Sequence, residues 1–126
     1  MPDLRRLQAL IERIGEMSRN DTVPWTETSV EAAFQASVNQ YTVTIEKEYL
    51  GQNWGEDVYG HVFRIHDSEG KLLDEVRARD FPENTWFQGH ERPEDVLRDL
   101  YDRARRKALR VDKQLDDLLA SLDSLQ

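Results

Sequence analysis

The fold is decided by residues 41–78, which read YTVTIEKEYLGQNWGEDVYGHVFRIHDSEGKLLDEVRA. Side chains of two kinds alternate along its first part, as expected of a half-buried β-strand with a period of two. One set is Tyr41, Val43, Ile45, Lys47 and Tyr49, and the other is Thr42, Thr44, Glu46 and Glu48. A second alternating run covers residues 58–65, with Tyr59, His61, Phe63 and Ile65 on one parity.

A hairpin and a third strand complete this stretch. Residues 67–71, Asp-Ser-Glu-Gly-Lys, have the composition of a hairpin turn, and Gly70 can adopt a positive φ. The third run begins at Leu72 and ends near Arg79. Between the first two strands we expect an eight-residue loop, 50–57, with Trp54 at its centre. Residues 41–78 therefore predict a three-stranded antiparallel meander.

Helices are expected on either side of the meander. An amphipathic stripe predicts an N-terminal helix over residues 3–18, and its apolar side chains include Leu4, Leu7, Ile11 and Ile14. Thr28-Ser29-Val30-Glu31 has the form of a capping box, which predicts a short helical turn through Phe34. The fold class is α+β, with an N-terminal helix, the three-stranded meander and a long C-terminal helix.

The last third of the chain has the most regular pattern. Its apolar residues are spaced alternately by four and three, at Leu97, Tyr101, Ala104, Ala108, Val111, Leu115, Leu118, Leu122 and Leu125. A single helix over 94–126 would be about 50 Å long, whereas a compact chain of this length is only about 35 Å across. The helix therefore either breaks near Arg110–Asp112, with Asp112 as a new N-cap, or projects and requires a partner.

Length and composition limit the function classes. The chain of 126 residues predicts one domain, 1–126, with 112–126 as a leucine-rich helical extension. Acids outnumber bases 25 to 17, for a formal net charge of -8, which argues against nucleic acid as a partner. No run approaches the roughly 18 apolar residues of a membrane helix, so we expect no membrane partner and a cytoplasmic location. The chain has no cysteine, which excludes disulfides and thiolate chemistry.

Catalytic and metal-binding motifs are not evident. Asp57 and His61 are the only pair of nearby metal-ligating side chains expected on one face of a strand, and two ligands do not make a site. The serines lack a Gly-x-Ser-x-Gly elbow, and the two glycines at 51 and 55 lack a phosphate-loop lysine. We therefore expect no catalytic residue, no cofactor and no metal.

Candidate interaction residues come from the terminal helices and the aromatic loops. Two tryptophans, Trp54 and Trp86, lie in expected loops, where they either cover the core or mark a surface that meets a ligand or partner. The leucines of the C-terminal extension are Leu115, Leu118, Leu122 and Leu125. They could be covered within the chain by Leu4, Leu7, Ile11 and Ile14, or by a second copy in a two-fold dimer, which we favour.

Three functional classes are compatible with these patterns. The favoured class is a non-catalytic interaction or regulatory module that self-associates and docks to a protein partner. The second is an acidic inhibitor, of antitoxin or immunity type, that masks a basic enzyme site. The third is a small enzyme with a site assembled from scattered residues. In the predicted core we place Tyr41, Val43, Ile45, Phe63, Ile65, Leu97, Leu100 and Tyr101.

Overall fold

The computed structural model describes residues 3–125. Within that range, five antiparallel strands form one sheet in the order β1-β2-β3-β4-β5. The strands are β1 (Thr26–Glu27), β2 (Ala33–Val38), β3 (Tyr41–Asn53), β4 (Glu56–His66) and β5 (Leu72–Arg77). The helices are α1 (Leu4–Arg19), the 3-10 turn η1 (Ala78–Asp80), α2 (Pro93–Ala108) and α3 (Val111–Asp123).

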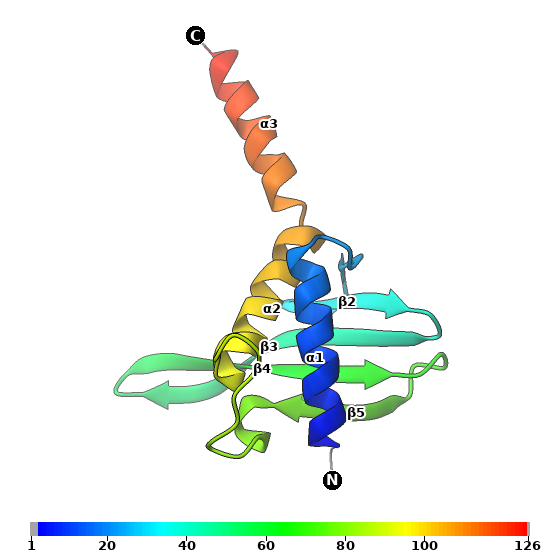
Figure 1. Ribbon diagram of the computed structural model, residues 1–126. Coiled ribbons are helices and arrows are strands. Elements are labelled where there is room, and N and C mark those ends of the chain that lie inside the picture. The colour runs from blue at the N-terminus through cyan, green and yellow to red at the C-terminus, as the bar shows by residue number, and fades with distance from the viewer. Residues whose placement is uncertain (1–2, 126) are drawn as a thin grey trace.

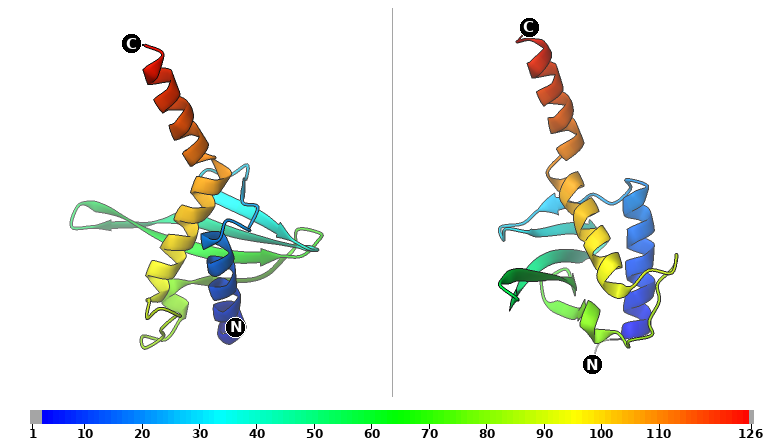
Figure 2. Two further views of the ribbon diagram at one scale, coloured as in Figure 1. Left: turned by 45° about the horizontal axis from the view of Figure 1, so that its top comes forward. Right: turned by 90° about the vertical axis from the view of Figure 1, so that its left-hand side faces the viewer.

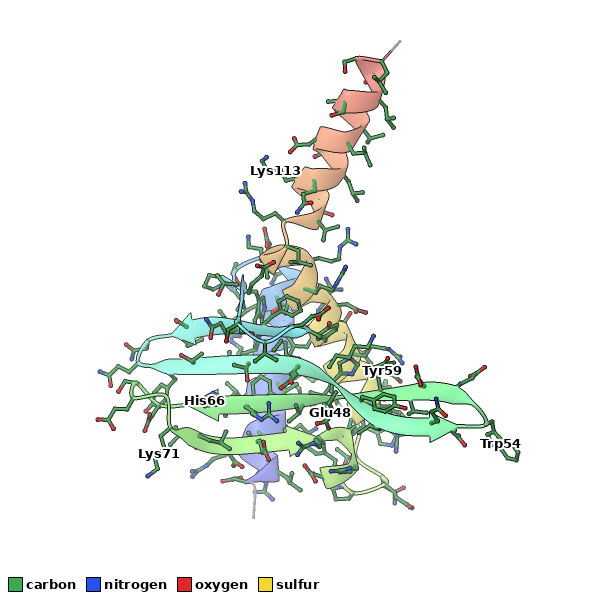
Figure 3. The ribbon with its side chains drawn as sticks, turned by 180° about the vertical axis from the view of Figure 1, so that it is seen from behind. Glu48, Trp54, Tyr59, His66, Lys71 and Lys113 are labelled. Carbon is green, nitrogen blue, oxygen red and sulfur yellow. The ribbon has the colours of Figure 1, made fainter. Side chains whose placement is uncertain are left out.

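Two helices cover one face of the sheet, and α3 leaves the body of the molecule. Figure 1 shows α1 and α2 lying across the strands, and the edge-on view in Figure 2 places both on the same side. Among residues 3–125, no helix covers the opposite face of the sheet (Figure 3). In both figures α3 projects away from the sheet and from α1.

The hydrophobic core lies between the sheet and these two helices. Phe63 of β4 is fully buried at its centre, opposite Ile45 of β3 on one side and Val76 of β5 on the other. The helices contribute apolar side chains at helical spacing, which are Leu7, Ile11, Ile14, Leu97, Leu100, Tyr101 and Ala104. The alternation of apolar and polar residues in β3 and β4 thus directs one parity inward.

The predicted three-stranded meander is wrong, because β1 and β2 precede it and extend the sheet to five strands. The expected helical turn near Phe34 is replaced by a bend followed by β2. The Thr28 hydroxyl oxygen lies 2.9 Å from the backbone carbonyls of both Val30 and Ala33, to either of which it can donate, and it accepts from the Val30 N–H. It therefore closes a local turn and does not cap a helix. The α+β class itself holds.

Two further expectations about β3 and β4 need correction. The expected eight-residue loop is a tight turn, because β3 continues to Asn53 and β4 begins at Glu56. Tyr41 is 48% exposed and lies outside the core. It is the first residue of β3, beyond the part of the sheet that the helices cover, and it faces Val38 across the hairpin. Ile65 is only partly buried, whereas the other six predicted core residues are buried.

The C-terminal helix breaks where the sequence offered that alternative. Arg110 has a φ of 53° and a ψ of 45°, a left-handed conformation that ends α2 and turns the chain before α3. Asp112 does not cap the new helix, because α3 begins at Val111 with Arg110 at the N-cap position. The Asp112 carboxylate instead accepts a hydrogen bond from Arg106. Two separate helices therefore replace the single helix of 33 residues.

Candidate protein-interaction surface

The apolar face of α3 is uncovered. We call Leu115, Leu118, Leu122 and Leu125 the leucine seam, since their spacing of three and four places them on one side of a helix. Leu118 is 56% exposed and Leu125 is 80% exposed, and from residue 112 to 125 every side chain is exposed. Among the described residues, α2 is the only element with which α3 makes more than weak contact, at the junction between the two helices. The leucine seam is therefore an apolar surface open to solvent.

The structure does not bring the N-terminal helix to the leucine seam. Leu7, Ile11 and Ile14 are buried against the sheet and α2, and Leu4 packs at the edge of the same core. These four side chains are already used inside the body of the molecule. They therefore cannot also cover α3, and closure of the seam within the chain is excluded in this arrangement.

The charged residues of α3 lie away from the leucine seam. At 100° per residue, Asp112 projects about 100° from the centre of the seam. Asp116, Asp117 and Asp123 project about 120–140° from it, and Lys113 projects nearly opposite to it. Lys113 forms an ion pair with Asp117 at 3.0 Å. The residues that flank the seam are Gln114, Ser121 and Leu119, which carry no charge. An approaching apolar surface would thus meet leucines bordered by neutral groups.

A basic hollow lies at the base of α3. It has a volume of about 690 Å³ and is lined by six bases, Arg19, Arg103, Arg106, Lys107, Arg110 and Lys113. Most of these charges already have partners: Lys107 pairs with Asp21 at 3.0 Å, and Arg106 pairs with Asp112 at 2.6 Å. Because Lys113 lines the hollow and lies on the back of α3, the leucine seam faces the other way.

A second exposed surface is the hairpin arm, which we define as residues 48–60 of β3 and β4. Figure 3 shows this arm extending beyond the body, with Trp54 at its tip and Tyr59 near its base. Trp54 is 96% exposed. A bulge between Tyr49 and Gly51 twists the arm, and Leu50 lies so close to Gly60 that a Cβ there would be 2.9 Å from its Cδ1 atom.

The arm is stiffened by contacts of its side chains with one another and with Lys47, the residue before it. The rings of Tyr49 and Tyr59 meet edge to face at 5.6 Å, and the Lys47 ammonium lies 4.5 Å from the centre of the Tyr59 ring. The Tyr49 hydroxyl donates to the Asp57 carboxylate at 3.3 Å. The tip is nevertheless strained, since Trp54 has a φ of 54°, which is rare for a bulky residue.

Trp86, the other predicted tryptophan, lies in the loop before α2. Phe81 and Phe87 of this loop are buried and stack edge to face at 5.3 Å, whereas Trp86 is half exposed beneath the Arg92 guanidinium. The loop is tied to α1 through the Gln8 amide, which donates to the Trp86 carbonyl at 3.0 Å. Phe81 and Phe87 thus anchor this loop to the core, whereas Trp86 is 55% exposed and less accessible than Trp54.

The uncovered sheet face carries a ladder of ion pairs across three strands. Arg64 of β4 donates to Glu46 at 2.6 Å and to Glu75 at 2.8 Å, and Arg77 of β5 donates to Glu48 at 2.7 Å. Beneath these side chains Val62 is fully buried. The ladder is thus a polar cover over Val62 on this face of the sheet.

The ion pairs of the ladder shift the pKa values of their members. The hydrogen bond from Arg64 lowers the pKa of Glu75, and the hydrogen bond to Glu48 raises the pKa of Arg77. Burial lowers the pKa of Arg64, but its hydrogen bonds to Glu75 and Glu46 outweigh burial, so the net pKa is raised. Each charge is held by an opposite charge, as in a structural network.

The candidate catalytic and metal-binding groups do not converge. The Asp57 carboxylate is engaged by Tyr49 and Gln52. His61 lies against the Tyr101 ring at 5.0 Å. Across residues 3–125, no three histidine, aspartate or glutamate side chains are grouped to hold a metal ion. None of the helices described here is both long and apolar enough to cross a bilayer.

Comparison of the chain with models of protein families, with curated proteins and with solved structures gives no match. Function must therefore be inferred from the surfaces of the molecule. Of these, the leucine seam was visible in the sequence through its spacing. The ion-pair ladder was not, because it depends on which strands pair and in which register.

Proposed function

We propose that this protein is a non-catalytic interaction module that self-associates through the leucine seam and docks to a protein partner. The observation that supports this proposal is the exposure of four leucines on a helix that projects from the body. Full burial of a leucine side chain is worth about 1.5–3 kcal/mol relative to its exposure. Covering the seam would therefore release a substantial free energy.

The length of α3 supports the same proposal. It has 13 residues, and isolated helices shorter than about 12–15 residues are marginal in water. The described residues tie it to the body through the break at Arg110, the ion pair between Arg106 and Asp112, and a hydrogen bond from the Gln114 side chain to the Leu109 carbonyl. A partner packed against the leucine seam would supply the tertiary contacts that such a helix needs.

The hairpin arm is the surface that we assign to the protein partner. Tryptophan is enriched among residues that dominate binding energy, and Trp54 is presented at the end of a stiff, twisted arm. Its strained backbone is retained although the side chain makes no contribution to the core. A role in binding accounts for both features.

The molar mass in solution tests self-association. We expect wild-type protein to show twice its chain mass of 14.8 kDa by light scattering, and Leu118→Asp to show the single chain mass. The matched control is Ala120→Asp, which places the same charge on the opposite side of α3 and should remain dimeric. A wild-type mass of 14.8 kDa at every accessible concentration would refute self-association.

A further inference from the structure

The leucine seam is nearly symmetric about Leu118. Val111 and Leu125 lie seven residues to either side of it, and Leu115 and Leu122 lie three and four residues away. If a second α3 runs antiparallel with the two Leu118 side chains at the two-fold axis, Leu115 of each copy meets Leu122 of the other. In this register Val111 meets Leu125. Val111 and each leucine of the seam then meet an apolar side chain of the second copy.

Charges along the chain favour this orientation. Six bases and one acid lie between residues 103 and 113, whereas three acids and no base lie between residues 116 and 125. An antiparallel pair places the acidic end of each α3 beside the basic junction of the other copy. It also brings the negative C-terminal end of each helix dipole toward those bases. A parallel pair would instead place the two acidic ends together.

The dimensions of the molecule also favour an antiparallel pair of α3 helices. Packed helices lie about 8–10 Å apart, whereas a compact body of this size is roughly 35 Å across. Two parallel α3 helices would hold the two junctions about 8–10 Å apart and would therefore bring the two bodies side by side. In the antiparallel register the bodies lie at opposite ends, and Leu125 of one copy reaches the level of Val111 of the other. Each helix thus ends where the other body begins.

We infer that a second copy of this chain covers the leucine seam, with the two α3 helices antiparallel and the two-fold axis at Leu118. This inference rests on the proposed self-association and specifies its geometry. It presents the two hairpin arms on bodies held at opposite ends of the helix pair. Gln114 of each copy then lies beside Ser121 of the other, so that neutral side chains border the paired seams.

Cysteine cross-linking tests the orientation, because the natural chain has no cysteine. Leu115→Cys and Leu122→Cys should each fail to cross-link alone. In each variant the two introduced cysteines, one in each copy, would be separated by about 9–12 Å along the helix axis, beyond disulfide reach. An equimolar mixture of the two variants, exchanged under reducing conditions and then oxidised, should form the mixed disulfide dimer. Leu118→Cys should cross-link with itself and serves as the positive control.

The alternative results are distinct. Cross-linking of Leu115→Cys or Leu122→Cys with itself would indicate a parallel pair, which overturns this inference and leaves self-association intact. A wild-type dimer in which none of these variants cross-links would show that the dimer uses another surface. That result would overturn both the antiparallel register and self-association through the leucine seam. A wild-type monomer would refute self-association and, with it, the antiparallel register. Circular dichroism of each variant checks that the body remains folded.

A charge substitution gives a second readout of opposite sign for the two orientations. Asp123→Lys adds a cation at the level of the basic junction of the second copy, and because Asp123 and Lys113 both project away from the seam, the effect is a long-range one that is screened at high salt. We therefore expect its dimer dissociation constant to rise at low salt. In a parallel pair the same change would relieve repulsion between acidic ends, and tighter association would contradict the inference. Asp116→Lys, at the level of Ala120 of the second copy, is the control and should change the constant less.

Discussion

The Arg106 guanidinium lies 2.6 Å from the Asp112 carboxylate, so that one ion pair spans the break between α2 and α3. Between these residues Arg110 adopts the left-handed conformation that separates the helices. Both side chains of the pair are more than half exposed, and such pairs contribute little stability. The direction of α3 is therefore set chiefly by the backbone of Arg110.

Replacement of Arg110 tests this conclusion. A left-handed conformation costs a residue with a Cβ about 1–2 kcal/mol, and glycine avoids this cost. We expect Arg110→Gly to be more stable than Arg110→Ala by about 1 kcal/mol, measured as the difference between their urea-unfolding free energies. Both variants lack the arginine charge, so the comparison isolates the backbone. Equal stabilities would mean that residue 110 does not hold this conformation in solution.

The sequence predicted those elements whose pattern is long and regular. The stripe of α1, the start of α2 at Pro93 and the alternation in β3 and β4 are all present in the structure. β2 was missed because Thr28 and Glu31 resemble a capping box, whereas the Thr28 hydroxyl serves a local turn. The tight turn at Trp54 was missed because tryptophan rarely adopts a positive φ.

The candidate surface was only partly predictable for a related reason. Periodicity along one helix identifies the leucine seam without knowledge of its neighbours. Whether another segment covers the seam depends on tertiary packing, and the N-terminal helix matches it equally well in spacing. The burial of Ile11 against the sheet decides this point, and no local pattern could have done so.

The ion-pair ladder is expected to contribute to stability. Arg64→Ala would remove two charge-assisted hydrogen bonds and uncover Val62. The Arg64 side chain is 26% exposed, so the loss should lie between that of an exposed pair and that of a buried pair, at about 1–3 kcal/mol. Chemical denaturation measures it. Arg13→Ala, which removes an exposed pair with Glu16, is the control and should change stability by less than about 0.5 kcal/mol.

His61 should make stability depend on pH near neutrality. Burial lowers the pKa of His61, Lys47 and Arg98 act in the same direction, and Asp102 and Glu48 oppose them. The unfolded chain therefore binds a proton to this histidine at a higher pH than the folded chain does. Its contribution to stability is complete above the unfolded pKa of about 6.5 and is lost as the pH falls toward the folded pKa.

Substitution of His61 isolates this effect. Thermal midpoints measured from pH 7.5 to pH 5 should fall with acidification in the wild-type protein, and the slope should become smaller in His61→Gln. His66→Gln is the control: it retains His61, so the change of its thermal midpoint with pH that is due to His61 should remain. An unchanged slope in His61→Gln would show that another group causes any loss of stability over this range.

Trp54 and Gly55 form the two-residue turn of the hairpin arm, with φ angles of 54° and 81°. These are the positive angles of a type I′ turn, for which Asn-Gly is the preferred pair. Trp54→Asn should therefore stabilise the chain by about 0.5–1 kcal/mol, although it removes a large aromatic side chain. Trp54→Val is the control, because a β-branched residue is disfavoured at positive φ and should not stabilise the chain. Urea unfolding measures both variants. A destabilised Trp54→Asn would show that the indole ring makes contacts within the folded chain, which would contradict its assignment as a free binding surface.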